Sequence, residues 1–340
     1  MAAAVGGSRR ASAGGLAPDR RDPNAGQAGD VMKLRLGTRG SALALWQSRH
    51  IAARLAAAHF DLKVELVEIV SAGDRIVDLP LWQVEGTGFF TAALEQALLS
   101  GQIDVAVHSY KDLPVESSAT LVVAAVPTRG PVEDVLCARD GLTLAQLPAG
   151  ARIGTCSTRR MAQVKRLRGD LELMPLRGNV PTRVARVGVD LDAVVLARAG
   201  IERLGLAHAI TETFPTTVML PAPAQGALAV QCRATELDVR RRIEVLDDAT
   251  TRRAVDAERA VLHALGGGCS VPVGAVATVS PTGIHLIASV FGVRTAIAIR
   301  LEITGVEPVA LGHLAAARLI DQGAGDILAE CAPAPTRAQA

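Results

Sequence analysis

The chain has 340 residues, of which 49% are hydrophobic and 21% are charged, a composition typical of a globular protein with room for two or three domains. A net charge of +2 and an aromatic content of 2% argue against a nucleic-acid-binding protein, which needs a basic surface and rings for stacking. The sequence contains no apolar run of 18 residues, so it predicts no membrane span.

The cysteines indicate the redox environment of the protein, and the two ends of the chain are expected to lie outside its fold. The five cysteines are odd in number and widely spaced, and none forms a C-x-x-C pair. This pattern is typical of reduced thiols in a cytoplasmic protein and predicts neither disulfides nor a metal site. Residues 1–31 lack the apolar core of a secretion signal, so we expect a disordered extension with Met32 as a candidate start. Residues 332–340 are expected to form a tail.

A first α/β unit is expected to begin at Lys33. Its expected elements, in chain order, are a strand at 33–37, a helix from the 38–41 turn to about Ala58, a strand at 62–70, a helix at 89–99, and strands at 103–107 and 121–126. Residues 71–88 show no periodicity and contain three glycines, so this long connection is a candidate mobile lid.

The chain is then expected to cross into a second α/β unit after Arg129 and to return through the Pro-rich segment 220–226. The expected elements of this unit are strands at 151–154, 171–176 and 193–196, and helices at 157–167, after 180, and at 198–204. Residues 227–232 are apolar enough to insert into the first sheet. Two crossings predict two lobes around a cleft, with domain 1 at 32–128 and 224–246 and domain 2 at 129–223.

The C-terminal part, 247–331, reads as a small α+β third domain. Its expected elements are a helix at 251–265, antiparallel strands at 271–279, 284–290 and 296–303, and a helix at 308–322. The predicted fold class is therefore α/β, with two α/β domains around a cleft and a small α+β C-terminal domain.

Five arginines fall at or near the expected strand-to-helix turns of the two lobes, where free backbone N–H groups already favour anions. They are Arg39, Arg159, Arg160, Arg177 and Arg183. The same turns carry the hydroxyl and amide side chains of Thr38, Ser41, Thr155, Ser157 and Asn179. This repetition predicts a polyanionic ligand in the cleft, although the spacing does not distinguish carboxylate from phosphate.

Three further residues allow two interpretations each. Lys111-Asp112 follows a buried strand, so Asp112 is either part of a surface turn or a group that gives and takes protons. His108 is either a general base or a hydrogen-bonded structural residue. Cys269 follows three glycines, which fits both a packed thiol after a helix end and a sulfur with open space for a larger group.

The chain resembles the porphobilinogen deaminase (hydroxymethylbilane synthase) family from about Leu34 to Glu330. The segments that carry the resemblance, in order, are 36–41, 43–47, 104–114, 154–160, 176–183, 220–233 and 267–272. The resemblance implies two domains like type II periplasmic binding proteins and a third domain. It also implies the head-to-tail joining of four porphobilinogen molecules into hydroxymethylbilane, with release of four ammonia.

The resemblance implies a dipyrromethane cofactor held by a thioether to Cys269, and Asp112 as the catalytic group that holds pyrrole N–H groups and stabilises the azafulvene cation. Its further cofactor-binding residues are Lys111, Arg159, Arg160, Arg177, Ser109, Thr155, Ser157, Asn179 and Gln225. Its substrate-binding residues are Arg39, Ser41, Arg177, Arg183 and Phe90. Such a ligand carries many carboxylates, for which arginine forks are suitable hosts.

The lid departs from the pattern of some relatives, because Thr87 and Gln83 stand where those relatives carry lysine. A lid of this composition contacts carboxylates less directly. We expect a cytoplasmic monomer with porphobilinogen and the growing polypyrrole as its ligands. The alternative function is a non-catalytic, two-lobed anion-binding protein.

Overall fold

The computed structural model describes residues 6–7, 31–70, 91–116, 118–268 and 271–330, and it contains three β-sheets. The first sheet has the order β2-β1-β3-β10-β4. Its strands are β1 (Met32–Thr38), β2 (Leu62–Glu68), β3 (Val105–Ser109), β4 (Leu121–Ala125) and β10 (Leu228–Arg233), and its helices are α1 (Ala42–Ala58), α3 (Ala92–Leu99) and α7 (Leu237–Glu244). β1, β2 and β3 are parallel, whereas β10 runs antiparallel to both of its neighbours.

The second sheet has the order β7-β6-β8-β5-β9. Its strands are β5 (Asp134–Ala138), β6 (Arg152–Gly154), β7 (Glu172–Met174), β8 (Ala193–Ala197) and β9 (Glu212–Thr213), and its helices are α4 (Thr158–Leu167), α5 (Val180–Val184) and α6 (Arg198–Arg203). β5 is antiparallel to both neighbours. The antiparallel strands, β10 in the first sheet and β5 in the second, are each the first strand after a crossover. This is the type II order that the resemblance implied.

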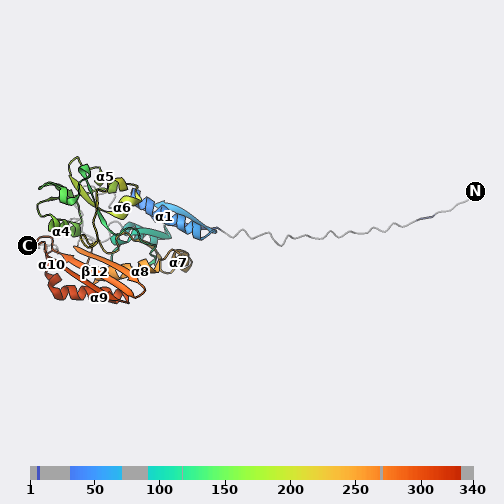
Figure 1. Ribbon diagram of the computed structural model, residues 1–340. Coiled ribbons are helices and arrows are strands. Elements are labelled where there is room, and N and C mark those ends of the chain that lie inside the picture. Colours follow the sequence, from blue (N-terminus) through green and yellow to red (C-terminus); the bar gives the residue numbers. More distant parts are fainter. Residues whose placement is uncertain (1–5, 8–30, 71–90, 117, 269–270, 331–340) are drawn as a thin grey trace, which may run out of the picture.

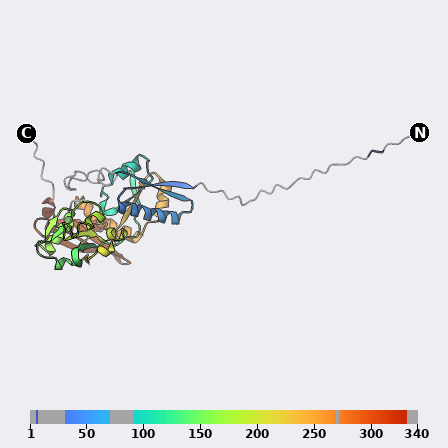
Figure 2. The same cartoon turned by 90° about the horizontal axis from the view of Figure 1, so that it is seen from above.

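The third sheet is antiparallel, with the order β11-β12-β13, and two helices pack on one of its faces. Its elements are α8 (Ala249–Ala264), β11 (Val273–Ser280), β12 (Gly283–Phe291), β13 (Ala298–Gly305), α9 (Pro308–Leu319) and α10 (Gly325–Ala329). Figure 1 shows this domain as one layer, with α5 and α6 on the opposite side of the molecule and α4 next to β12, and Figure 2 shows from above the first lobe, in blue and teal, beside the other two domains. The predicted fold class is confirmed, while the domain boundaries at single residues stay predictions.

Among the elements that the sequence did not predict are β5 in the second lobe and α7 in the first. β5 was not expected, because its apolar run of four residues after Asp134 is short and closely follows the crossing at Arg129. α7 was also not expected, although its buried residues Val239 and Ile243 stand four positions apart, as on one face of a helix. The candidate lid 71–88, Phe90 and Cys269 lie outside the described residues.

The two crossovers lie against each other. Gly130 N–H donates to the Gly226 carbonyl at 3.2 Å, and Gly226 adopts a φ of +85°. A Cβ at Gly226 would lie 2.5 Å from the Pro131 carbonyl oxygen, so only glycine fits where the two segments cross.

A buried ion pair joins the third domain to this crossing. Arg129 makes two bonds of 2.7 and 2.8 Å to the fully buried Glu258 carboxylate, which also accepts the N–H groups of Ala224 and Ala277. The Arg129 Nε donates to the Gln225 carbonyl at 2.7 Å. One carboxylate of α8 therefore holds both crossing segments and β11, which fixes the third domain against the lobes.

Candidate active site

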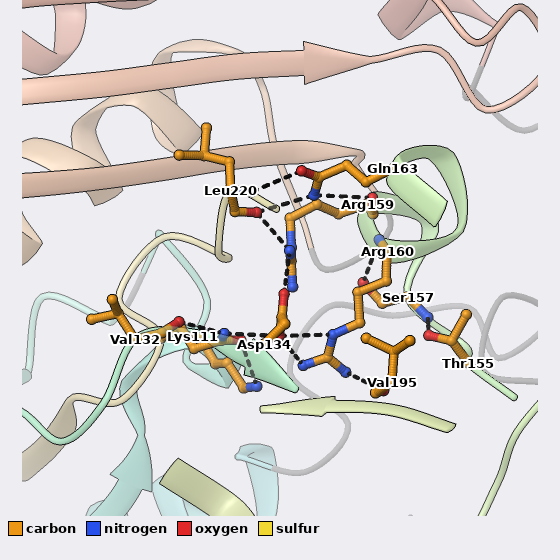
Figure 3. A network of polar contacts seen from close by, with 11 residues as sticks. Lys111, Val132, Asp134, Thr155, Ser157, Arg159, Arg160, Gln163, Val195 and Leu220 are labelled. Atoms are coloured by element: carbon orange, nitrogen blue, oxygen red, sulfur yellow. Dashed lines mark hydrogen bonds and ion pairs between the residues drawn. The ribbon is translucent and has the colours of Figure 1, made fainter. Parts of the chain in front are cut away.

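The centre of the site is Asp134, the first residue of β5, which is fully buried between two arginines of α4 (Figure 3). Its Oδ2 accepts from Arg159 Nη1 at 2.7 Å, and its Oδ1 accepts from Arg160 Nε and Nη2 at 3.0 and 2.7 Å. Burial alone would raise the pKa of Asp134, but the two guanidinium charges outweigh burial and hold that pKa well below its ordinary value. Asp134 is therefore a carboxylate throughout the physiological range.

Lys111 joins the same network through Gln225. Lys111 Nζ donates to Gln225 Oε1 at 3.3 Å, and Gln225 Nε2 donates to Asp134 Oδ1 at 2.9 Å and to the Val132 carbonyl at 2.7 Å. Burial lowers the pKa of the Lys111 ammonium to about 8, and Arg160 lowers it further, while Asp112 and Asp134 oppose the shift. Lys111 keeps some exposed surface and lines a cavity, so ligands can reach it.

The site carries more positive than negative charge. Three cations, Lys111, Arg159 and Arg160, surround one buried carboxylate. Unpaired buried charges cost several kcal/mol each, so such a group is expected to receive anions. Two of the buried side-chain nitrogens that lack a hydrogen-bond partner among the described residues are Arg159 Nε and Arg177 Nη2. Both belong to the predicted anion-binding arginines, so the residues present fit a group rich in carboxylates.

A cavity of about 90 Å³ lies between the two lobes and brings together part of the predicted set. Its polar lining consists of Gln47, Ser109, Lys111, Arg160, Arg183 and Arg203. Gln47 Nε2 donates to Ser109 Oγ at 2.8 Å, which links α1 to the end of β3. Arg183 Nε donates to the Gly178 carbonyl at 2.7 Å. Ser109, Lys111, Arg160 and Arg183 therefore line one cavity from both lobes.

Arg159 differs from the expectation that it faces a ligand with its fork. Its Nη1 donates to Asp134 and, at 2.6 Å, to the Leu220 carbonyl, and its residue is only 3% exposed. Gln163, one turn further along α4, also donates to the Leu220 carbonyl and accepts the Leu220 N–H. The reason for the difference is Asp134, which pairs with Nη1 inside the protein, while Nε is buried without a hydrogen-bond partner among the described residues.

Three of the predicted hydroxyl and amide side chains act as helix N-caps. Ser41 Oγ accepts the Ala44 N–H at 3.3 Å, Ser157 Oγ accepts the Arg160 N–H at 3.4 Å, and Asn179 Oδ1 accepts the Thr182 N–H at 2.9 Å. Thr155 is buried, and its Oγ1 accepts the Ser157 N–H at 3.3 Å. The three caps fix where α1, α4 and α5 begin, and they thereby orient the neighbouring arginines.

The two interpretations that the sequence left open for Asp112 and for His108 are distinguished by their surroundings. Asp112 is exposed, and its carboxylate accepts no hydrogen bond from any described residue. His108 is buried and donates from Nε2 to Gln231 Oε1 at 3.1 Å, and burial lowers its pKa to about 4. A neutral, hydrogen-bonded imidazole supports the structural interpretation of His108, whereas Asp112 stands free to meet a ligand.

Sequence reasoning missed Asp134, Gln163 and Arg203. Arg203 stacks over Trp46 at 5.5 Å from the ring centroid and donates to the Gly226 carbonyl at 2.7 Å, and burial lowers its pKa to about 10. An acidic residue at the start of an apolar run, as in Glu133-Asp134-Val135-Leu136, is the signal that could have found Asp134. Arg203 lies at the end of a short helix, which no turn motif marks.

Two searches of the described residues complete the survey. No cluster of three His, Cys, Asp or Glu side chains in this part of the chain could hold a metal ion. Within the same ranges, no helix is both long enough and apolar enough to cross a membrane.

The ionisation of Lys111 predicts a pH dependence of anion binding. In the Cys269→Ala protein we expect the affinity for a small dicarboxylate to be constant up to about pH 7.5 and to fall above pH 8, by at most about tenfold per pH unit, because only the protonated amine attracts carboxylates. The effect of rising pH on the stability of the fold is opposite to its effect on binding. The folded-state pKa lies below the ordinary lysine value of 10.5, so the cost of burying this charge is largest below pH 8 and is relieved between pH 8 and 10.5.

Calorimetric titration at several pH values measures this dependence. Lys111→Arg keeps a charge at all these values and is expected to remove the decline, while Lys111→Gln is expected to bind at pH 7 as weakly as the parent protein binds at pH 9.5. Equal affinity of the parent protein at pH 7 and pH 9.5 would contradict the role given to Lys111.

The chain matches two family models. Residues 34–241 match "Porphobilinogen deaminase, dipyromethane cofactor binding domain", and residues 252–321 match "Porphobilinogen deaminase, C-terminal domain". A low similarity to solved structures includes the methionine binding protein MetQ, with 12% identity, a TM-score of 0.42, and coverage of 63% of this chain and 89% of that chain.

Curated relatives carry the same family name. The porphobilinogen deaminase of Mycolicibacterium gilvum is 51% identical over 72% of this chain and 78% of its own length. That of Micrococcus luteus is 50% identical over 72% of this chain and 73% of its own length. That of Brevibacillus brevis is 43% identical over 88% of this chain and 97% of its own length. The chain belongs to the porphobilinogen deaminase family.

Proposed function

We propose that this chain is a transferase that joins four porphobilinogen molecules head to tail into hydroxymethylbilane and releases four ammonia, in tetrapyrrole biosynthesis. The observation that carries the proposal is the surplus of positive charge at the cleft, where Lys111, Arg159 and Arg160 outnumber the two carboxylates Asp112 and Asp134. Each porphobilinogen brings an acetate and a propionate, so the substrate and the lengthening chain supply the anions that this charge needs.

The residues divide into those that bind and one that handles protons. Arg160, Arg183 and Lys111 line the cavity between the lobes and are placed to hold carboxylates by charge-assisted hydrogen bonds. The bound dipyrromethane supplies the pyrrole carbon to which the first substrate is joined. Asp112 has no internal hydrogen bond among the described residues, so its carboxylate is available to a pyrrole N–H and to the proton that leaves with ammonia.

The attachment of the cofactor to Cys269 is supported by the state of two other thiols. Burial raises the pKa of Cys137 and of Cys232 to about 11, so neither offers a thiolate near neutral pH. Cys156 is exposed between Thr155 and Ser157, beside the arginines of α4, and is therefore the competitor among the described residues that an experiment has to exclude, while Cys331 lies outside them.

Intact-mass measurement of the purified protein tests the function directly. We expect the unaltered chain to carry a covalent increment equal to a dipyrromethane and to consume porphobilinogen. Cys269→Ala is expected to lose both the increment and turnover, because a thioether needs the sulfur. Cys156→Ala is the matched control and is expected to keep both.

Other outcomes would redirect the assignment. An increment that disappears in Cys156→Ala and persists in Cys269→Ala would move the attachment to α4. An unaltered chain without an increment that leaves porphobilinogen untouched would favour a non-catalytic anion-binding protein. A cytoplasmic location and a monomeric state complete the proposal, and cell fractionation and light scattering test them.

A further inference from the structure

The turn that carries Lys111 and Asp112 is held from outside its own domain. The turn is a single 3-10 turn, Tyr110–Asp112, at the end of β3, and the residue that holds it is Arg259, in the middle of α8 of the third domain. Arg259 Nη1 donates to the Tyr110 carbonyl at 3.1 Å and to the Leu113 carbonyl at 2.9 Å, and Nη2 donates to the Pro114 carbonyl at 2.7 Å.

The guanidinium also packs on the turn. Its carbon lies 4.4 Å from the centroid of the Tyr110 ring, which is a cation–π contact, and Tyr110 and Leu113 are both buried. Within the turn, Leu113 N–H donates to the Tyr110 carbonyl at 3.3 Å, and Tyr110 N–H donates to the Ala227 carbonyl of the returning segment at 3.0 Å. The start of the turn is thus fixed by the first sheet, and its end is fixed by Arg259.

These contacts decide where Asp112 lies. Its carboxylate accepts no hydrogen bond from the described residues, so no side-chain contact corrects its position if the backbone moves. Carbonyl oxygens that leave a β-ladder need other donors when they are buried. A guanidinium can serve three of them at once because its N–H groups form a rigid planar fork, which an ammonium group does not.

We propose that Arg259 is a positioning residue, which holds the Tyr110–Pro114 turn so that Asp112 meets the substrate at the correct distance. This inference rests on the proposed function, in which Asp112 touches the substrate. Arg259 itself acts through the turn. Because α8 ends at Ala264, five residues before Cys269 in the sequence, the same helix precedes the attachment residue and holds the turn that carries Asp112.

Arg259→Lys in the full-length holoenzyme tests the proposal, because it keeps the positive charge and removes the fork. We expect kcat to fall roughly 10- to 100-fold, as a displacement of about 1 Å at a reacting group can cause, while KM changes by less than about threefold. Hydrogen–deuterium exchange of peptides covering 110–116 is expected to become about tenfold faster, because the turn opens more often. The mass increment is expected to remain.

Arg252→Lys is the matched control. Arg252 lies on the same helix and also binds carbonyls of the first domain, those of Val123 and Ala124 at 3.3 and 3.2 Å, but it makes no hydrogen bond to the turn among the described residues. We expect near-normal kcat and unchanged exchange at 110–116 in this variant. Equal losses of kcat in the two variants would show that docking of α8 matters and would overturn the specific role of Arg259.

A second variant keeps the test decisive if Arg259→Lys folds poorly. Tyr110→Leu removes the ring under the guanidinium and keeps the three carbonyl contacts, so it should produce a smaller change of the same kind. Unchanged exchange at 110–116 in both variants would refute the proposal that Arg259 holds the turn. If the unaltered protein does not consume porphobilinogen, the proposed function fails, and exchange at 110–116 still decides whether Arg259 holds the turn.

Discussion

Asp134→Asn is expected to lower the free energy of unfolding by about 3–5 kcal/mol, the usual cost of removing one partner from a buried ion pair. The substitution keeps the shape of the side chain but leaves Arg159, Arg160 and Lys111 without their shared carboxylate. Like charges that share a desolvated site repel strongly, so the loss is much larger than for a surface pair. Denaturant unfolding, followed by the midpoint and the slope, measures the difference.

The pH dependence of this difference has a defined sign. The folded-state pKa of Asp134 is depressed, so its stabilising contribution is complete above the unfolded value of about 3.9 and is lost as the pH falls below it. The gap between the unaltered protein and Asp134→Asn is therefore expected to be constant from pH 5 to 7 and to shrink below about pH 4. Asp170→Asn, which breaks the exposed pair with Arg168, is the control and should change stability little. Comparable losses in the two variants would contradict the central place of Asp134.

Asp112→Asn is expected to lower turnover of porphobilinogen by about 10²- to 10⁴-fold while the protein stays folded, because a positioned proton donor or acceptor contributes on this order. The carboxylate is exposed and accepts no hydrogen bond from the described residues, so its replacement is expected to change stability by no more than about 0.5 kcal/mol. Single-turnover consumption of porphobilinogen and thermal unfolding measure the two effects separately.

Glu116→Gln is the matched control for this prediction, since it removes an exposed carboxylate four residues further along the same connection. We expect it to leave turnover unchanged. Near-normal turnover in Asp112→Asn, or an equal loss in Glu116→Gln, would remove Asp112 from the chemistry. Loss of activity together with lowered stability would instead indicate a structural role.

Local patterns predicted most of the architecture. Ser41 and Ser157 marked the starts of α1 and α4, because a cap is encoded by one side chain and the three residues after it. The insertion of β10 into the first sheet followed from a short apolar run after a Pro-rich return. β5 escaped prediction, because a five-residue strand directly after a crossing carries no turn signal of its own.

The sequence by itself determined the family, the alternation of strands and helices, and the set of arginines at helix starts, because each of these depends on residues that are neighbours along the chain. Only the tertiary structure decided which charges meet. Asp134 pairs with α4, Gln225 reaches it from 91 residues away, and Arg259 holds the turn of Asp112 from about 150 residues away. These long-range contacts depend on how the two lobes cross and on how α8 docks, and no local sequence pattern encodes the crossing or the docking.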